Sequence, residues 1–348
     1  MGNKSILYLT VFRSFAPSPL FSQSKSLNLC SCKFIHIFAS VSYNSLHTSV
    51  GKSCFSAFLS SVFINELSIT YNSFLSYSDQ VLALRDCRFD SIRSQSATGG
   101  AVYCKNVELS ICYCVFYYCH ATSQAGAFFH DKGSLKLECT EITRCSAVKQ
   151  TTCGANAFVC NQAAGRATYV SLHLSGPTQG ANADSSFEFT SNTTHITYFN
   201  LTDCNGVSGG AGGCLRIQTN SYYNYSTVFN CSDHNSVEGW SSVITVFRNN
   251  FVHNTRNTHC FLWGQSNTLF SFDACIFINN HKTTLSTANS FTIKNSLSDT
   301  PYKSISTTTN IQSYSYIYVC ESHHSTVQPV FRANRSFLHL FLLYFPTN

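Results

Sequence analysis

The sequence predicts an all-β protein built as a parallel β-helix, a single solenoid of about ten coils with 26 to 30 residues in each coil. Three observations lead to this fold class: a repeated Gly-Ala dipeptide, a repeated set of apolar positions, and a composition that suits strands and turns. Charged residues make up 11% of the 348 residues, whereas an ordinary soluble domain has roughly 25%. The chain has 29 Phe and 18 Tyr but one Met, which favours strands over helices.

The Gly-Ala dipeptide recurs five times, with steps of 26, 28, 26 and 30 residues. In a solenoid of that period, its glycines stack in one column at a corner of the coil. Glycine is expected at a corner where a Cβ atom would collide with the backbone or where φ is positive. The predicted corner column consists of Gly100, Gly126, Gly154, Gly180 and Gly210.

A second pattern places two apolar residues five positions apart and a Cys or Asn three positions after the second one. Because side chains alternate along a strand, the second apolar residue is predicted to form an interior ladder. The Cys or Asn then lies at another corner, where stacked amides can hydrogen-bond along the solenoid. The predicted ladder is Phe89, Phe116, Ile142, Leu201, Val228, Phe251 and Phe277, and the predicted corner is Cys119, Cys145, Cys204, Cys231, Asn254 and Asn280. Weaker copies add Phe34 and Phe63 to the ladder, and the wide interval from Ile142 to Leu201 corresponds to two coils.

Other repeat architectures fit less well. The leucine-rich core is missing, ankyrin and tetratricopeptide repeats need helices, and no segment keeps helical apolar spacing over ten residues. The repeats cover residues 29–285. We expect residues 1–28 to form an N-terminal segment or cap with a weak signal-peptide pattern, and residues 286–348 to form degenerate coils with an apolar tail. That tail, FLHLFLLYF, has nine residues, about half of a membrane span, so no transmembrane helix is predicted.

The spacing of reactive side chains predicts no catalytic residue, metal ligand or cofactor. The 16 Asp and Glu include no Asp-Asp pair of the kind that glycoside hydrolysis would use. Alternate residues of a strand, as in Cys30-x-Cys32 and Cys112-x-Cys114, lie too far apart for zinc pairs that converge on one point. The basic cluster of Arg85, Arg88 and Arg93 is interrupted by two Asp, so no nucleic-acid surface is predicted.

The repeat accounts for most of the cysteines. Cys32, Cys87, Cys114 and Cys275 each lie two positions before a ladder Phe, where small buried side chains are expected. Cysteines stacked on adjacent coils are also within the Cα range of a disulfide. The pairs to test are Cys87 with Cys114, Cys119 with Cys145, and Cys204 with Cys231.

The repeats resemble those of a known class of proteins. GGAV (Gly99 to Val102), FVHN (Phe251 to Asn254) and FINN (Phe277 to Asn280) are similar to the GGA[ILV] and FxxN repeats of the polymorphic outer membrane proteins of chlamydiae and of surface proteins of trichomonad-type protozoa. More broadly, they resemble right-handed parallel β-helices of the pectin-lyase-like class. In most copies, Cys or Ile replaces the Asn of those families.

The resemblance implies a right-handed coil, a cell-surface or secreted location, and a non-enzymatic, adhesin-like function with glycans or cell-surface proteins as partners. Two alternatives remain open: a polysaccharide-active lyase or glycoside hydrolase, and a partial member of a large repeat family without independent function. N-glycosylation sequons favour secretion. They lie at Asn3, Asn192, Asn200, Asn224, Asn230 and Asn334.

Overall fold

The computed structural model describes part of the chain. The described residues are 3–12, 21–22, 26–35, 42–43, 47–56, 63–65, 81–94, 99–147, 155–175, 185–190, 194–204, 213–217, 220–231, 235–240, 243–254, 262–265, 269–280, 291–298 and 309–313. All of them belong to one unit, Met1–Tyr314, and the second unit, Ser315–Asn348, lies outside the described residues. Every regular element in the described residues is a β-strand.

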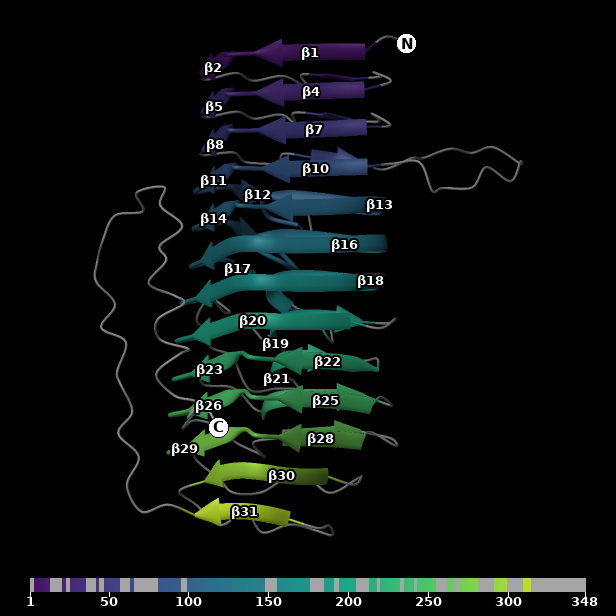
Figure 1. Ribbon diagram of the computed structural model, residues 1–348. Coiled ribbons are helices and arrows are strands. Elements are labelled where there is room, and N and C mark those ends of the chain that lie inside the picture. Colours follow the sequence, from purple (N-terminus) through teal and green to yellow (C-terminus); the bar gives the residue numbers. More distant parts are fainter. Residues whose placement is uncertain are drawn as a thin grey trace, which may run out of the picture. The chain divides into compact units, whose positions relative to one another are not determined.

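The strands pair in parallel and in register from one coil to the next, so that equivalent strands form columns (Figure 1). The first column is β1 (Asn3–Leu7), β4 (Ser26–Cys30), β7 (His47–Gly51), β10 (Val81–Arg85), β13 (Val102–Cys112), β16 (Phe128–Thr143), β18 (Ala155–His173), β20 (Thr194–Thr202), β22 (Ser221–Asn224), β25 (Val243–Phe247), β28 (Leu269–Asp273), β30 (Phe291–Ser298) and β31 (Thr309–Ser313).

The second column consists of three-residue strands that follow the first column after a corner. Its strands are β2 (Thr10–Phe12), β5 (Lys33–Ile35), β8 (Cys54–Ser56), β11 (Arg88–Asp90), β14 (Val115–Tyr117), the ends of β16, β18 and β20, then β23 (Thr227–Phe229), β26 (Asn250–Val252), β29 (Ile276–Ile278) and the end of β30.

A third column and a small separate sheet complete the coil. The third column is β3 (Phe21–Ser22), β6 (Ser42–Tyr43), β9 (Phe63–Asn65), the starts of β13, β16 and β18, then β19 (Ser185–Thr190), β21 (Gly213–Ile217), β24 (Asn235–Trp240) and β27 (Leu262–Gln265). The small sheet is β12 (Arg93–Ser94), β15 (His120–Ala121) and β17 (Ser146–Ala147).

The prediction of an all-β parallel solenoid is therefore confirmed, whereas its handedness and its number of coils stay predictions. The predicted domain boundaries do not interrupt the columns. Within residues 1–28, β1 pairs with β4, and within residues 286–348, β30 pairs with β31. The predicted apolar tail, residues 337–345, lies outside the described residues.

The interior of the second column is one continuous ladder. Phe89 stacks on Phe116 with ring centroids 4.7 Å apart and planes within 6°, because the strands themselves are separated by about 4.8 Å. Burial of each such ring contributes roughly 1.5–3 kcal/mol. The buried residues of this ladder are Phe34, Phe89, Phe116, Ile142, Leu172, Leu201, Val228, Phe251 and Phe277, and the backbone of Phe55 is in register with Phe34 and Phe89. Leu172 occupies the coil between Ile142 and Leu201.

The assignment of Phe63 to this ladder was wrong. Phe55 is the residue that pairs with Phe34 and with Phe89, whereas Phe63 lies in the third column, opposite Val102. The coil from Phe34 to Phe55 is shorter than the repeat period, and the coil from Phe55 to Phe89 is longer. Counting with a constant period therefore selected the wrong Phe.

The glycine corner depends on close backbone contact. A Cβ atom on Gly100 would lie 2.0 Å from the carbonyl oxygen of Gly126, although Gly100 itself does not have a positive φ. Gly99 has that conformation, with φ of 70°. Gly100 and Gly126 are thus stacked on neighbouring coils. Gly154, Gly180 and Gly210 lie outside the described residues.

Two columns of left-handed residues border the three-residue strands. None of them is a glycine, and bulky residues with positive φ are uncommon. The first column, between the first and second strands of each coil, is Tyr8, Ser31, Lys52, Asp86, Tyr113, Cys139, Tyr169, Tyr198, Tyr225, Arg248, Ala274 and Asn295. The second, after the three-residue strand, is Ser91, Tyr118, Arg144, Leu174, Asp203, Asn230, His253 and Asn279.

Candidate functional site

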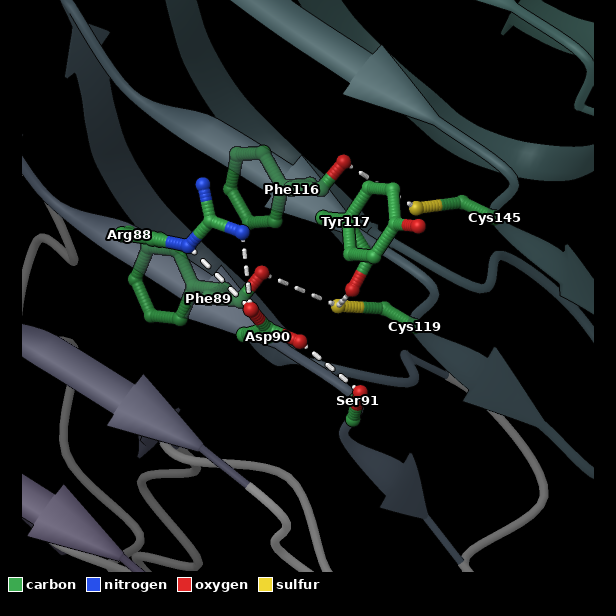
Figure 2. A network of polar contacts seen from close by, with 8 residues as sticks. All are labelled: Arg88, Phe89, Asp90, Ser91, Phe116, Tyr117, Cys119 and Cys145. Carbon is green, nitrogen blue, oxygen red and sulfur yellow. Dashed lines mark hydrogen bonds and ion pairs between the residues drawn. The ribbon is translucent and has the colours of Figure 1, made fainter. Parts of the chain in front are cut away.

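The predicted Cys and Asn corner joins successive coils by hydrogen bonds. The Cys119 thiol donates to the carbonyl oxygen of Phe89, one coil earlier, at 3.7 Å, and the Cys145 thiol donates to that of Phe116 at 3.6 Å (Figure 2). Asn254 repeats the contact with Val228 at 3.0 Å. Cys204 bonds to Leu172 and Asn280 to Phe251 in the same way. These residues therefore hold one coil on the next.

Sequence reasoning missed one member of this corner. Ser175 lies three positions after the ladder residue Leu172, and its hydroxyl accepts the Cys145 N–H at 3.1 Å. The double interval between Ile142 and Leu201 left this coil without an assigned corner. A small residue with a hydroxyl group, three positions after an apolar ladder residue, is the sequence signal that identifies this corner.

Cysteines two positions before the ladder have a similar structural role. The Cys87 thiol donates to the carbonyl oxygens of Arg85 at 3.2 Å and Val50 at 3.3 Å. Ser53 and Ser226 occupy the same place in other coils and also donate to the carbonyl oxygen two residues earlier. Thiol and hydroxyl side chains therefore both occur in this column. The buried cysteines of this column are Cys32, Cys87, Cys114 and Cys275.

Thiol chemistry is disfavoured at Cys119 and Cys204. Burial raises the pKa of the Cys119 thiol well above its usual range, and it does the same at Cys204. A protonated thiol is a poor nucleophile and metal ligand. Cys119 is in hydrogen-bond contact with Cys145, and Cys204 with Cys231, but all described cysteines are free thiols.

The described residues contain no group of three or more His, Cys, Asp or Glu side chains arranged to hold a metal ion. His130 is the buried histidine of the interior. Its Nε2 atom lies 2.8 Å from the carbonyl oxygen of Val107, and its Nδ1 atom lies 3.8 Å from the Cys160 sulfur. Burial lowers the pKa of His130. With no exposed surface on either side chain, this pair is part of the core.

Each arginine of the basic cluster interacts with another side chain of the fold. Arg88 binds the Asp90 carboxylate at 2.8 Å and lies over the Tyr117 ring of the next coil, 5.6 Å from its centroid (Figure 2). Arg85 lies in the same way over Tyr113, at 6.0 Å. Arg93 lies over Tyr118 at 5.8 Å. Such cation–π pairs stabilise exposed sites by about 0.5–1 kcal/mol, which gives these cations a structural role.

An aromatic stack at the surface occupies three successive coils, with Tyr169 exposed and Tyr198 and Tyr225 half-buried. Tyr169, Tyr198 and Tyr225 belong to the first column of left-handed residues, between the first and second strands of each coil. The Tyr169 and Tyr198 rings are stacked with centroids 4.7 Å apart and planes within 2°. Tyr198 and Tyr225 are stacked at 5.3 Å and 19°. Tyr169 remains 51% exposed.

The neighbouring strand residues extend this stack into a surface. His195 stacks on Tyr222 with centroids 5.1 Å apart and planes within 9°, and Arg166 lies in register with His195 on the coil before. Between the two aromatic rows lie Thr168, Thr197 and Asn224, which are also in register. We call this surface the aromatic face. It consists of Arg166, Thr168, Tyr169, His195, Thr197, Tyr198, Tyr222, Asn224 and Tyr225.

The Tyr198 hydroxyl group stays protonated at neutral pH. Burial and the neighbouring Tyr169 and Tyr225 raise the pKa of Tyr198, so its hydroxyl is both a donor and an acceptor at neutral pH. At one end of the stack, the Tyr225 ring meets Phe247 edge to face at 5.6 Å. Phe247, which lies on the following coil, therefore packs against this end of the stack.

Sequence reasoning missed the aromatic face. Its signal is present as RATY, HITY and YYNY, which begin at residues 166, 195 and 222 and follow the period of the repeat. In each, the second residue points to the interior and the other three form the surface. Comparison of the inward-facing positions alone aligns the coils but gives no information about the side chains on their outer surface.

The chain matches no protein-family model, no curated protein and no solved structure. Within the part of the chain that the structure describes, no helix is long and apolar enough to cross a membrane.

Proposed function

We propose that this protein is a non-enzymatic, adhesin-like protein of the cell surface, and that its aromatic face binds glycans. The observation that carries the proposal is the surface stack of Tyr169, Tyr198 and Tyr225, in which Tyr169 is exposed and the other two rings are half-buried. Resemblance of the GGA and FxxN repeats to those of surface proteins supports the location. The right-handed, pectin-lyase-like coil belongs to the same proposal.

The geometry of the stack favours binding through ring edges and hydroxyl groups. The rings cover one another's faces, so their edges and hydroxyl oxygens are the groups that remain for a partner. Tyrosine adds contact area with few rotatable bonds, and stacking fixes the rings before a ligand arrives. Thr168 and Thr197 add hydroxyl groups beside them. Sugar hydroxyls pair with such groups as both donors and acceptors.

Repetition along the solenoid compensates for weak individual contacts. Equivalent groups recur at intervals of 4.7 to 5.3 Å, so one extended ligand meets several of them at once. Contacts that act on the same ligand gain from effective concentration. A polysaccharide that lies along the face therefore fits better than a single small sugar.

A polysaccharide-active enzyme is the second candidate. Hydrolysis would need two carboxylates on either side of the scissile bond. None of the nine residues of the aromatic face is acidic, and the nearby Glu138 is paired with Lys136 at 3.0 Å. Binding without turnover is therefore the function that this face supports best. The third candidate, a partial repeat protein without independent function, predicts no specific ligand.

Glycan-array binding by the full chain tests the proposal, with Tyr198→Ala as the variant and Tyr118→Ala as the control. Tyr118 is another left-handed tyrosine at the surface, but it lies at the other corner, outside the aromatic face. We expect Tyr198→Ala to weaken binding at least tenfold and Tyr118→Ala to leave it unchanged. Equal binding by both variants would refute the role of the face.

Two further measurements separate the alternatives. Release of reducing ends or unsaturated products from the bound polysaccharide would favour the enzyme, and capture of a cell-surface protein without any glycan would favour a protein-binding face. Antibody labelling of intact and permeabilised cells tests the location. Labelling only after permeabilisation would exclude surface display.

A further inference from the structure

Three of the six N-glycosylation sequons have described side chains, and these differ in their surroundings. Asn200 and Asn224 lie within β20 and β22, whereas Asn230 follows β23. The other three cannot be compared, because Asn192 and Asn334 lie outside the described residues and only the backbone of Asn3 is described.

Asn230 lies at an exposed corner of the coil. It has φ of 49° and belongs to the second column of left-handed residues, and its side chain is exposed. Its Nδ2 atom donates to the Asp203 Oδ1 atom of the preceding coil. An amide nitrogen carries two hydrogens, so one can be replaced while the other keeps this bond.

Asn200 and Asn224 are much more confined. Each is half-buried within a strand, and the Oδ1 atom of each is inaccessible to solvent. Asn224 lies between Thr197 and Phe247 of the adjacent coils, and Asn200 lies next to Thr227. Adjacent strands are about 4.8 Å apart, which leaves little room for a sugar between these side chains.

We propose that Asn230 is an N-glycosylation site, modified by an oligosaccharide from a lipid diphosphate donor. The Asn230 Nδ2 atom forms a bond to C1 of the first sugar as the C1–O bond to the lipid diphosphate breaks. The lipid diphosphate leaves with the electron pair of that bond, and Nδ2 loses one proton to a base of the transferase. No electrons are transferred to or from an oxidant.

The site does not depend on glycan binding by the aromatic face. Asn230 follows the three-residue strand β23 (Thr227–Phe229), whereas Tyr225 precedes it. A glycan at the second corner leaves the tyrosine stack on the other side of this strand. Failure of one proposal therefore leaves the other unaffected.

The proposal is tested by expressing the full chain in eukaryotic cells with a cleavable signal peptide added at its N-terminus, so that the protein is secreted. Glycan occupancy is mapped by mass spectrometry after an amidase converts each modified Asn to Asp. We expect Asn230 to be occupied in the secreted folded protein, and Asn200 and Asn224 to be largely unoccupied. The variants Asn200→Gln and Asn224→Gln should then leave the glycan content of the secreted protein unchanged.

Ser232→Ala provides a variant that destroys the sequon but retains the bond between Asn230 and Asp203. It should remove the same glycan as Asn230→Gln, while the circular dichroism spectrum stays that of a β-protein. An unmodified Asn230 in folded secreted protein overturns the proposal, as does equal occupancy at Asn200 or Asn224.

Discussion

Asn254 and Asn280 occupy the same buried corner on neighbouring coils, and the Asn254 Nδ2 atom donates to the Asn280 Oδ1 atom at 2.9 Å. The same oxygen also accepts the backbone N–H of Asn254 at 3.1 Å. Asn280 in turn donates to the carbonyl oxygen of Phe251 at 2.8 Å. Each amide therefore satisfies backbone groups that would otherwise be buried without partners at the corner.

Asn254→Ala should lower the free energy of unfolding by roughly 2–6 kcal/mol. It leaves the Cys231 N–H and the Val228 carbonyl without their partners, and each unsatisfied buried group costs roughly 1–3 kcal/mol. Urea denaturation measures the loss, with the exposed Asn28→Ala as a control. A loss as small as that of the control would show that the amide ladder contributes little.

Gly100→Ala should destabilise the protein strongly, whereas Gly51→Ala should have little effect. The new Cβ atom at Gly100 would lie 2.0 Å from a backbone oxygen, but at Gly51 no atom lies within 4 Å. Neither glycine has a positive φ, so the comparison isolates steric collision. Thermal unfolding of both variants measures the difference. Similar unfolding midpoints would mean that the backbones of the two coils can separate at this corner without a loss of stability.

Much of the fold could be predicted from the sequence because inward positions obey a simple rule. An interior ladder accepts only apolar side chains of similar size, so Phe89, Phe116 and Phe251 repeat visibly. Corners are less restrictive, since Cys119 and Asn254 both donate to the ladder carbonyl oxygen one coil earlier, and Ser175 at the same corner donates to the carbonyl oxygen two residues before it. Ser175 was therefore missed. A varying coil length misplaced Phe63.

The candidate site was harder to predict for a different physical reason. Outward residues are not selected by packing, and Tyr198 acquires its role only from the rings of Tyr169 and Tyr225 on the neighbouring coils. Its left-handed backbone conformation, which turns the ring outward at the corner, is also unusual for a tyrosine. A pattern based on hydrophobicity records neither the stacking of rings on neighbouring coils nor the left-handed conformation of Tyr198.

Acid should destabilise the protein through His130. Burial lowers the pKa of His130 in the folded state, against the hydrogen bond to Val107 and the charge of Asp131. The unfolded chain therefore takes up a proton near pH 6.5 that the folded chain does not, and stability falls as the pH drops below this value. Urea denaturation between about pH 7 and pH 5 measures the slope.

His130→Gln removes the titrating group and should flatten this slope, even if the variant is less stable overall. His195→Gln, which changes an exposed histidine of the aromatic face, serves as the comparison. If His130→Gln retained the full acid slope, other groups would be responsible for it.

Alkali should destabilise the protein through its buried thiols. Burial raises the pKa of Cys275 to about 12, and burial also raises the pKa of Cys104 and Cys160. Because the unfolded chain loses these protons near pH 9 and the folded chain retains them, stability is complete below that pH and declines above it. Cys275→Ser should reduce the alkaline slope. Ser226→Ala, at the same position of another coil, should lower stability without changing that slope.

Thiol labelling should separate the stacked interior cysteines from those near the surface. Cys119 and Cys145 are fully buried, whereas Cys112 and Cys139 are half-buried, and a thiol must be reached by the reagent and ionised before its thiolate can attack an alkylating reagent. In the folded protein we expect labelling at Cys112 and Cys139 but protection at Cys119 and Cys145. Peptide mapping by mass spectrometry identifies the modified positions.

Unfolding without a reductant then tests whether the stacked pairs are disulfides. Their Cα atoms, about 4.8 Å apart on adjacent coils, are within disulfide range. However, side chains that project in parallel keep the Cβ atoms about as far apart, whereas a disulfide prefers about 3.8 Å. We therefore expect Cys119 and Cys145 to become labelled on unfolding. A pair that stays unlabelled, with a mass lower by two hydrogens, would show instead that these coils are covalently joined.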